Sequence, residues 1–327
     1  MKNVCIVGYG AIAPIHAAAL EVIDEANFYA VCDCDENRIS RCLKKYNVVA
    51  YNDFSTMLED TSIDTVHICT PHYLHYEMVK RALEKGKDVV CEKPIAMNEE
   101  ELKKMLGLPN VEKVAVVFQN RLNTCVMKMK AMLEEKTFGE VLGVRGLVTW
   151  NRDANYYKTD AWRGKWETEG GGVLINQSVH TLDLMGYLAG GFRSLKASMM
   201  NFSLKDVIEV EDTFTASLRM KNDAKAIFFA TNAFAANSSP DVQVVCERGV
   251  LHYTDDKLFV NDEIVCHDVT AEGEKAYWGT GHIQLLRNYY REGKYFSVFD
   301  AENTMKTLYA MYESAKHDGA EITVNGV

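Results

Sequence analysis

The strongest constraint on the fold of this chain is a strand, turn, helix and strand pattern in its first 33 residues. An apolar run at residues 4–7 stops at Gly8-Tyr9-Gly10-Ala11-Ile12-Ala13, and a second apolar run ends at Asp33. Gly8 permits the tight turn, Gly10 lets the backbone approach phosphates, and Ala13 is small enough for helix-to-strand packing. The pattern predicts a βαβ unit that binds the pyrophosphate of a dinucleotide at a helix N-terminus.

Asp33 indicates which dinucleotide is bound. It lies 20 residues beyond Ala13, where an acidic side chain accepts hydrogen bonds from the adenosine ribose hydroxyls. Cys34 and Asp35 follow it, so no Arg or Ser stands directly beside it to hold a 2′-phosphate. We therefore predict NAD, and Arg38 keeps NADP as the weaker alternative.

The composition predicts a globular chain with two domains. A length of 327 residues exceeds the usual size of a single core, and 47% of the residues are hydrophobic. The formal charge of −10 provides no general attraction to nucleic acid or to an acidic membrane surface. A strand that begins by Asn3 leaves no room for a signal peptide, and no apolar run is long enough to span a membrane, so we expect a cytoplasmic protein.

The cysteine and histidine spacing predicts neither disulfides nor a metal site. The nine cysteines are scattered and mostly embedded in apolar runs, as reduced core thiols are. Cys32 and Cys34 lack a second pair of ligands, and His72 and His75 lack a third ligand nearby.

Strands and helices alternate up to residue 118, with apolar strand-like runs at residues 48–51, 65–69, 88–91 and 114–118. This predicts a doubly wound parallel sheet in a domain of residues 1–120. Residues 121–327 have longer strand-like runs and predict an α+β domain with a large, mostly antiparallel open sheet. Its expected strands are 141–150, 192–202, 211–220, 226–234 and 242–246, and its expected helices are 124–136, 172–188, 282–291 and 301–316.

Two further motifs give the chain a family resemblance. Glu92-Lys93-Pro94 follows an apolar strand, and Gly170-Gly171-Gly172 precedes Asn176, His180 and Asp183. With the glycine-rich turn and the Thr70-Pro71 strand end, these motifs stand in the order and spacing of the glucose–fructose oxidoreductase, inositol dehydrogenase and MocA (Gfo/Idh/MocA) family, which the whole chain resembles. The resemblance implies an N-terminal Rossmann domain, a nicotinamide cofactor, a carbohydrate or cyclitol substrate, and a second domain often used for oligomerisation, here as a homodimer or homotetramer.

Oxidation of a secondary alcohol requires a base and a group that stabilises the developing alkoxide. The resemblance assigns these roles to Lys93 and His180, both also in contact with substrate. Asn176 is the departure from the pattern, because many family dehydrogenases carry Asp there. An amide cannot ionise, so we expect Asn176 to position a sugar hydroxyl while Lys93 and His180 carry the proton chemistry.

Further site residues are expected by position. Thr70, Pro71, His75, Glu92 and Lys93 follow strands of the first domain and are predicted to line the cofactor site, as are Asn120 and Arg163. Tyr156 and His282 are predicted to contact substrate, Tyr156 as an aromatic wall against the sugar. Two alternatives to a dehydrogenase stay open: a glycosidase that retains NAD and oxidises its substrate transiently, and a nucleotide-sensing regulator without catalysis.

Overall fold

The computed structural model describes residues 1–269 and 280–324. It divides the chain into two compact units, the first of residues 1–117 and 282–301, the second of residues 118–281 and 302–327. The change of unit at residue 117 lies close to the predicted boundary at residue 120. The return of residues 282–301 to the first unit was not anticipated.

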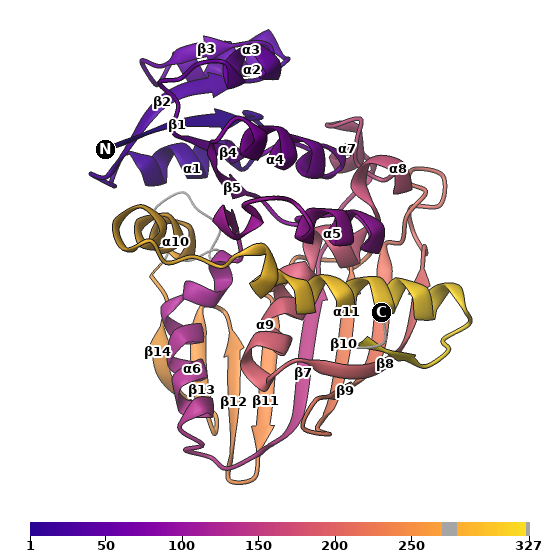
Figure 1. The fold of residues 1–327 in the computed structure, drawn as a ribbon. Helices are drawn as coiled ribbons and strands as arrows, with labels where there is room; N and C mark the ends of the chain where they lie inside the picture. Colours follow the sequence, from indigo (N-terminus) through magenta and orange to yellow (C-terminus); the bar gives the residue numbers. More distant parts are fainter. Residues whose placement is uncertain (270–279, 325–327) are drawn as a thin grey trace. The chain divides into compact units, whose positions relative to one another are not determined.

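The first unit contains the predicted parallel sheet, with strand order β3-β2-β1-β4-β5-β6 (Figure 1). Its strands are β1 (Lys2–Val7), β2 (Ala26–Cys32), β3 (Val49–Tyr51), β4 (Thr65–Ile68), β5 (Asp88–Cys91) and β6 (Val114–Val116). The central strands are buried on both faces, as their continuous apolar runs require. The reversal of strand order between β1 and β4 places the ligand crevice of such a sheet beyond the carboxyl ends of these two strands.

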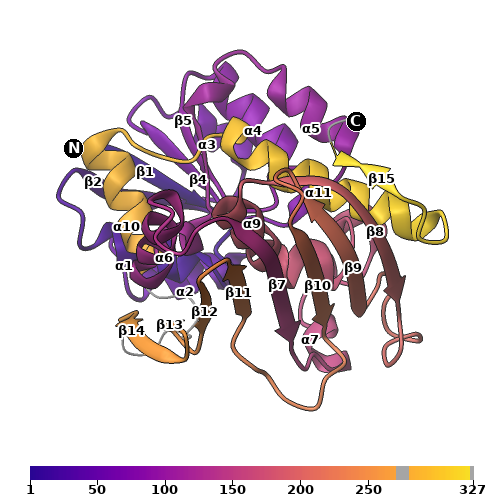
Figure 2. The same ribbon diagram turned by 90° about the horizontal axis from the view of Figure 1, so that it is seen from below.

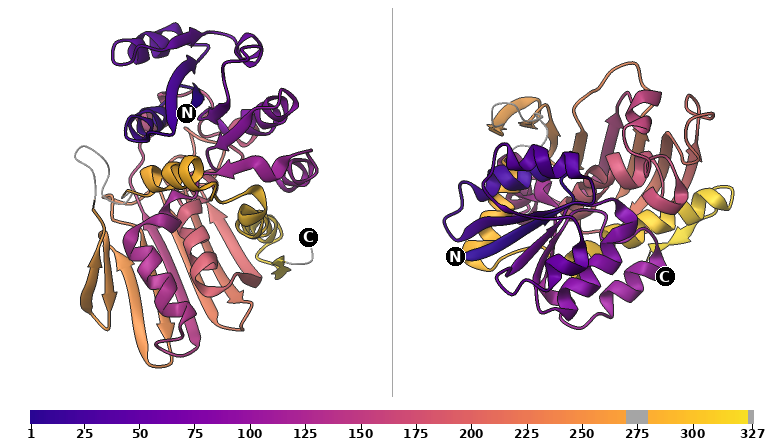
Figure 3. Two further views of the ribbon diagram at one scale, coloured as in Figure 1. Left: turned by 60° about the vertical axis from the view of Figure 1, so that its left-hand side comes forward. Right: turned by 90° about the horizontal axis from the view of Figure 1, so that it is seen from above.

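Helices cover both faces of this sheet (Figure 3). They are α1 (Ala13–Leu20), α2 (Glu36–Leu43), α3 (Phe54–Leu58), α4 (His75–Glu84) and α5 (Glu99–Leu106), with short 3₁₀ turns η1 (His72–Leu74) and η2 (Val111–Lys113). Side-chain oxygens of Asp35, Asp53 and Asn98 cap the N-termini of α2, α3 and α5, which fixes where these helices begin.

The return segment completes the edge of the parallel sheet. It consists of most of α10 (Gly281–Arg287), the π turn η6 (Asn288–Glu292) and an extended stretch. The backbone N–H of Val116 donates to the carbonyl of Phe296 at 2.7 Å, and Ala115 forms an antiparallel bridge with Ser297. A contact across this sequence separation leaves no local pattern, so sequence reasoning missed it.

The second unit is built on a nine-stranded sheet in the order β14-β13-β12-β11-β7-β10-β9-β8-β15. Its pairs are antiparallel except for β10 with β7, which confirms the mostly antiparallel prediction. The strands are β7 (Val141–Thr149), β8 (Phe192–Met200), β9 (Thr213–Met220), β10 (Lys225–Thr231), β11 (Asp241–Cys246), β12 (Gly249–Thr254), β13 (Lys257–Val260), β14 (Glu263–His267) and β15 (Ile322–Thr323). The last four were not predicted.

The longer helices of this unit pack on one face of the sheet (Figure 2). They are α6 (Thr124–Glu134), α9 (Val179–Ala189) and α11 (Val298–Lys316), and the shorter elements are η3 (Gln119–Leu122), α7 (Ala154–Lys158) and α8 (Trp166–Glu169). Burial alternates along β10, where Ala226, Phe228 and Ala230 are buried while Lys225 and Ile227 are exposed. The strands therefore have one core face and one open face.

The helix predicted over residues 172–188 is in fact two elements. A π turn, η4 (Val173–Gln177), precedes α9, and Ser178 between them has a non-helical backbone. The Ser178 hydroxyl donates toward the carbonyls of Val173 and Leu174, and this local bonding competes with a continuous helix. Consequently, Asn176 and His180 stand on separate elements, and both side chains are half-buried.

Among residues 1–269 and 280–324, no helix has both the length and the apolar character needed to cross a membrane.

Candidate functional site

The glycine-rich turn lies between β1 and α1, as predicted. Gly8 has φ +83°, and a Cβ there would lie 2.9 Å from the carbonyl oxygen of Cys69, so only glycine fits. At Gly10, the nearest atom to an added Cβ is Arg38 Nη1 at 3.9 Å, which leaves open space over the turn. Within the described residues, no side chain caps the N-terminus of α1. This turn fits a pyrophosphate, which backbone N–H groups and the helix dipole would hold.

Asp33 lies at the end of β2 and is buried. Its carboxylate accepts hydrogen bonds from the backbone N–H of Tyr9 at 2.6 Å and of Asp35 at 2.9 Å. A carboxylate offers about four lone-pair sites, so two remain for ribose hydroxyls. Arg38 Nη1 lies 3.9 Å from Asp33 Oδ2, within reach of the same region. The residues present fit NAD, and the negative charge of Asp33 opposes a 2′-phosphate.

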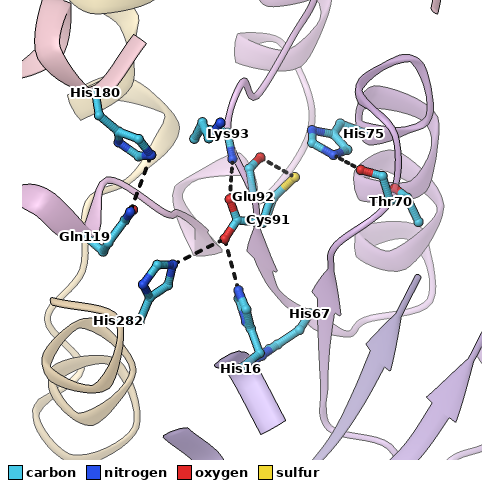
Figure 4. Close-up of polar contacts among 10 residues, drawn as sticks. All are labelled: His16, His67, Thr70, His75, Cys91, Glu92, Lys93, Gln119, His180 and His282. Atoms are coloured by element: carbon cyan, nitrogen blue, oxygen red, sulfur yellow. Dashed lines mark hydrogen bonds and ion pairs between the residues drawn. The ribbon is translucent and has the colours of Figure 1, made fainter. Parts of the chain in front are cut away.

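His75 ties together two strand ends of the first unit. It is fully buried at the start of α4, and its ring nitrogens lie 2.7 Å from the Pro94 carbonyl and 2.9 Å from the Thr70 carbonyl (Figure 4). The Lys93–Pro94 peptide bond is cis. His75 therefore braces the turns that carry Thr70, Pro71 and Lys93, and its contact with the cofactor stays a prediction.

Glu92 occupies the centre of a buried polar cluster in the first unit (Figure 4). Its Oε1 lies 3.0 Å from His16 Nε2 and 3.7 Å from His282 Nε2, while the backbone N–H of Lys93 donates to Oε2 at 3.3 Å. Burial by itself raises the pKa of Glu92, but the hydrogen bond from His16 and the nearby ring of His282 lower it well below its usual value. Glu92 is therefore an anion that fixes the turn holding Lys93.

A chain of hydrogen bonds extends this cluster away from Glu92. Burial by itself lowers the pKa of His16, yet contacts with Cys69 and Glu92 raise it to about 10, so both ring nitrogens of His16 carry protons. The pKa of His67 is lowered well below its usual value by burial and by the charge of His16, so His67 is neutral. His16 Nδ1 thus donates to His67 Nδ1 at 3.1 Å, and His67 Nε2 donates to the Tyr290 hydroxyl at 2.7 Å.

The same cluster contains a set of metal-ligand side chains. Ligand atoms of His16, Glu92 and His282 lie within 4.8 Å of one another, a spacing that a metal ion can bridge. The ion pair between the protonated imidazole of His16 and the Glu92 carboxylate explains the 3.0 Å distance between their nitrogen and oxygen atoms. His282 is buried in this cluster, and its predicted contact with substrate stays a prediction.

His180 lies in the first turn of α9, in the second unit. Its Nε2 is 3.4 Å from Gln119 Nε2 (Figure 4). Its ring packs edge-on against Phe118 with centroids 6.0 Å apart. An amide nitrogen can only donate, so this contact is a hydrogen bond when His180 Nε2 is unprotonated. A general base in its resting state needs that lone pair. Gln119, next to the predicted Asn120, was missed because a glutamine after a strand has no distinctive pattern.

Asp183 anchors the helix that carries His180. It is buried, and its carboxylate accepts hydrogen bonds from Arg121 and from the Thr304 hydroxyl. These bonds anchor α9 through Asp183.

Residues on either side of the glycine triplet in the sequence form two separate hydrogen-bonded groups. Asn176 Nδ2 donates to the buried carboxylate of Glu169 at 2.5 Å. Separately, the Tyr156 hydroxyl accepts hydrogen bonds from Arg163 Nη1 at 2.5 Å and from Gln177 Nε2 at 3.1 Å. Sequence reasoning missed Glu169, although its place directly before the triplet was a usable signal.

The structure thus gathers the predicted residues in two sets. Within the first unit, the turn after β1, the strand ends and the first turns of α1, α2 and α4 carry Gly8, Tyr9, Gly10, Ala11, Ile12, Ala13, Asp33, Arg38, Thr70, Pro71, His75, Glu92 and Lys93. Within the second unit, Tyr156 and Arg163 are in contact, Asn176 and His180 lie on adjoining elements, and Asn120 is buried in η3.

Two family models match the chain. Residues 2–120 match the oxidoreductase family with an NAD-binding Rossmann fold, and residues 126–252 match the GFO/IDH/MocA C-terminal domain. The parallel sheet with its glycine-rich turn and acidic strand end, joined to the open antiparallel sheet, defines an oxidoreductase with an NAD-binding Rossmann domain. The chain belongs to the Gfo/Idh/MocA family.

Named relatives and solved structures are consistent with this assignment. A levoglucosan dehydrogenase from Pseudarthrobacter phenanthrenivorans is 33% identical over 45% of this chain and 38% of its own length. A myo-inositol 2-dehydrogenase from Thermotoga maritima is 30% identical over 57% of this chain and 54% of its own length. The matched stretches thus span about half or less of these relatives.

The solved structures match over nearly the full chain. The WlbA dehydrogenase from Chromobacterium violaceum, in complex with NADH and UDP-GlcNAcA, has a TM-score of 0.87 at 28% identity and covers 98% of this chain and 95% of its own. A levoglucosan dehydrogenase in complex with NADH and levoglucosan has a TM-score of 0.88 at 23% identity, over 99% of both chains, and shows the fold.

Proposed function

We propose that this protein is an NAD-dependent dehydrogenase that transfers a hydride between nicotinamide and a secondary hydroxyl of a sugar, sugar derivative or inositol. The observation that carries the proposal is the pair of sites on the two units. Lys93 follows β5 in the NAD-binding unit, on a turn fixed by Glu92 and His75. His180 and Asn176 follow the glycine triplet in the second unit, in the order the family pattern requires.

The chemistry assigns a role to each side chain. Bound NAD⁺ supplies the hydride acceptor for the carbinol carbon. His180 Nε2 takes the hydroxyl proton: its contact with the Gln119 amide nitrogen requires an unprotonated Nε2, and the substrate hydroxyl replaces Gln119 at that lone pair. The Lys93 ammonium stabilises the alkoxide that develops as the hydride leaves. Asn176 positions a hydroxyl of the substrate, and Tyr156 presents its ring to the sugar.

The relatives support the substrate class. Levoglucosan and myo-inositol dehydrogenases, a D-glucoside 3-dehydrogenase and a glucose-6-phosphate 3-dehydrogenase are named among them. What these names share is oxidation at the hydroxyl of a cyclic polyol or sugar, and we propose that class for this chain.

We also propose that the protein forms a homodimer or homotetramer through the open face of the nine-stranded sheet. Ile227 and Val245 on that face are 54% and 36% exposed, and Phe229 pairs with Leu147 on adjacent strands. Such a face gains stability by covering its apolar side chains. A single light-scattering mass equal to the 36.9 kDa monomer would refute the oligomer.

All nine cysteines are free thiols, which supports a cytoplasmic location, testable by cell fractionation.

The test of the activity is absorbance at 340 nm with NAD⁺ or NADP⁺ against aldoses, amino sugars, inositols and simple glycosides. We expect NADH formation with at least one member of the panel, and a loss of about 10²- to 10⁴-fold in kcat for Lys93→Ala. The matched control is Lys85→Ala, since Lys85 is an exposed lysine in the turn before β5.

Cleavage of a glycoside without net NADH, in a protein that retains NAD, would contradict the dehydrogenase and favour the redox glycosidase. NAD binding without turnover of any substrate would favour the regulator.

A further inference from the structure

Glu169 is a buried carboxylate in contact with Asn176, the residue at which many family dehydrogenases carry Asp. It ends α8 and has no exposed surface. Its Oε2 accepts the backbone N–H of Gly164 at 2.5 Å, and its Oε1 accepts Asn176 Nδ2 at 2.5 Å. A buried carboxylate needs donors of this kind, because an unpaired charge away from water is costly.

This contact fixes the orientation of the Asn176 amide. A carboxylate accepts and does not donate, so the NH₂ end of the amide must face Glu169. The amide is planar, and its carbonyl oxygen Oδ1 therefore points away from Glu169. Residue 176 thus presents a neutral hydrogen-bond acceptor.

The backbone around the pair leaves little room for rearrangement. A Cβ on Gly172 would lie 1.9 Å from the carbonyl oxygen of Glu211, so the glycine segment is held directly against that strand end. The Glu211 carboxylate accepts the backbone N–H groups of Gly172 and Leu174, which holds both sides of the segment that leads to Asn176.

We propose that Glu169 is a positioning residue for substrate binding, which holds Asn176 so that its carbonyl oxygen accepts a hydrogen bond from a substrate hydroxyl. In this chain the buried carboxylate belongs to Glu169, which contacts residue 176. Residue 176 must therefore be an amide, which can donate a hydrogen bond to that carboxylate. An aspartate in place of Asn176 would bring two carboxylates into one contact, with neither able to donate unless one retains a proton. This inference rests on the proposed dehydrogenase function.

The test is a donor–acceptor exchange. In Glu169→Gln the introduced amide has one acceptor oxygen for two donors, and in Asn176→Asp two carboxylates face each other. In the double variant Glu169→Gln/Asn176→Asp, the introduced glutamine amide donates to the introduced aspartate and accepts the Gly164 N–H, so both of these hydrogen bonds are restored. We expect each single variant to lower kcat/KM, and the double variant to be at least about tenfold more active than the product of the single effects predicts.

A pH profile separates positioning from simple packing. Asn176→Asp should lose further activity as pH rises, because the proton shared by the two carboxylates is lost, and the double variant should not show this added loss. Glu167→Gln, an exposed residue on the same helix, is the matched control and should behave as the unsubstituted protein.

Unfolding in urea of the unsubstituted protein, the two single variants and the double variant provides a readout without substrate. Coupling in both kcat/KM and unfolding supports the proposal. Coupling in unfolding alone makes the pair structural and overturns the positioning role, and additive effects in both overturn it entirely. If the unsubstituted protein oxidises no member of the panel, the proposed function fails and the kinetic role with it, while the unfolding cycle still reports whether the pair is coupled.

Discussion

Arg121 donates two hydrogen bonds to the single carboxylate of Asp183, from Nε at 2.8 Å and from Nη2 at 2.6 Å. Both side chains are buried within the second unit, and the Thr304 hydroxyl donates to the same carboxylate at 2.7 Å. The pair joins η3 to α9, so it fixes the two elements that carry Gln119 and His180.

The first prediction concerns the stability of this pair. Arg121→Leu should lower the free energy of unfolding by about 3–5 kcal/mol, because it leaves the Asp183 charge buried and uncompensated. The double variant Arg121→Leu/Asp183→Leu should cost less than the sum of the two single variants, since it removes both charges. Urea unfolding of the three variants measures this, and additive costs would show that the pair is not coupled.

The second prediction concerns the choice between NAD and NADP. Asp33→Asn retains an oxygen for the Tyr9 N–H but removes the charge that opposes a 2′-phosphate, with Arg38 nearby. The ratio of kcat/KM for NAD⁺ over NADP⁺ should fall by about tenfold or more. Asp35→Asn is the control, because Asn also caps α2 and this carboxylate is the more exposed one. An unchanged ratio in Asp33→Asn would remove Asp33 from cofactor selection.

The third prediction concerns pH and stability. Burial raises the pKa of Glu211 to about 7, above its usual value near 4.5. The folded protein therefore binds more protons here than the unfolded chain, and stability falls as pH rises from about 4.5 through 7. Glu211→Gln should remove this contribution, on the order of 3 kcal/mol between pH 4 and pH 8.

The measurement is the unfolding free energy of both proteins across that pH range. Glu209→Gln, an exposed glutamate two residues earlier, should keep the pH dependence of the unsubstituted protein. A Glu211→Gln variant with the same slope as the unsubstituted protein would show that Glu211 does not titrate in this window.

The fourth prediction concerns His180 as the base. His180→Gln should lower kcat for alcohol oxidation by about 10²- to 10⁴-fold, and the acid limb of the pH–rate profile should disappear with it. Its melting temperature should stay close to that of the unsubstituted protein, because the side chain is only half-buried. His317→Gln, on an exposed histidine, is the control. Retention of the acid limb would assign the titrating base to another group.

Local sequence patterns were sufficient for the parallel strands of the first unit and for its dinucleotide turn. Buried parallel strands need continuous apolar runs, and the turn after β1 needs a residue that tolerates φ +83°, so Gly8 and the runs around it predict the sheet and the dinucleotide turn directly. Caps such as Asp53 act within three residues, so the start of α3 follows from local chemistry.

Tertiary structure decided what depends on residues far apart in sequence. His16, Glu92 and His282 meet across 266 residues of chain, as Arg291 and Glu25 also do, and no local pattern encodes such a contact. The glycine segment before η4 is held against Glu211, a contact with a residue 39 positions further along the chain that helical spacing does not encode. The sequence by itself determined the dinucleotide turn, the fold class and the candidate pair of Lys93 and His180. Only the folded chain decided their partners, because a buried charge takes its protonation and orientation from whatever surrounds it.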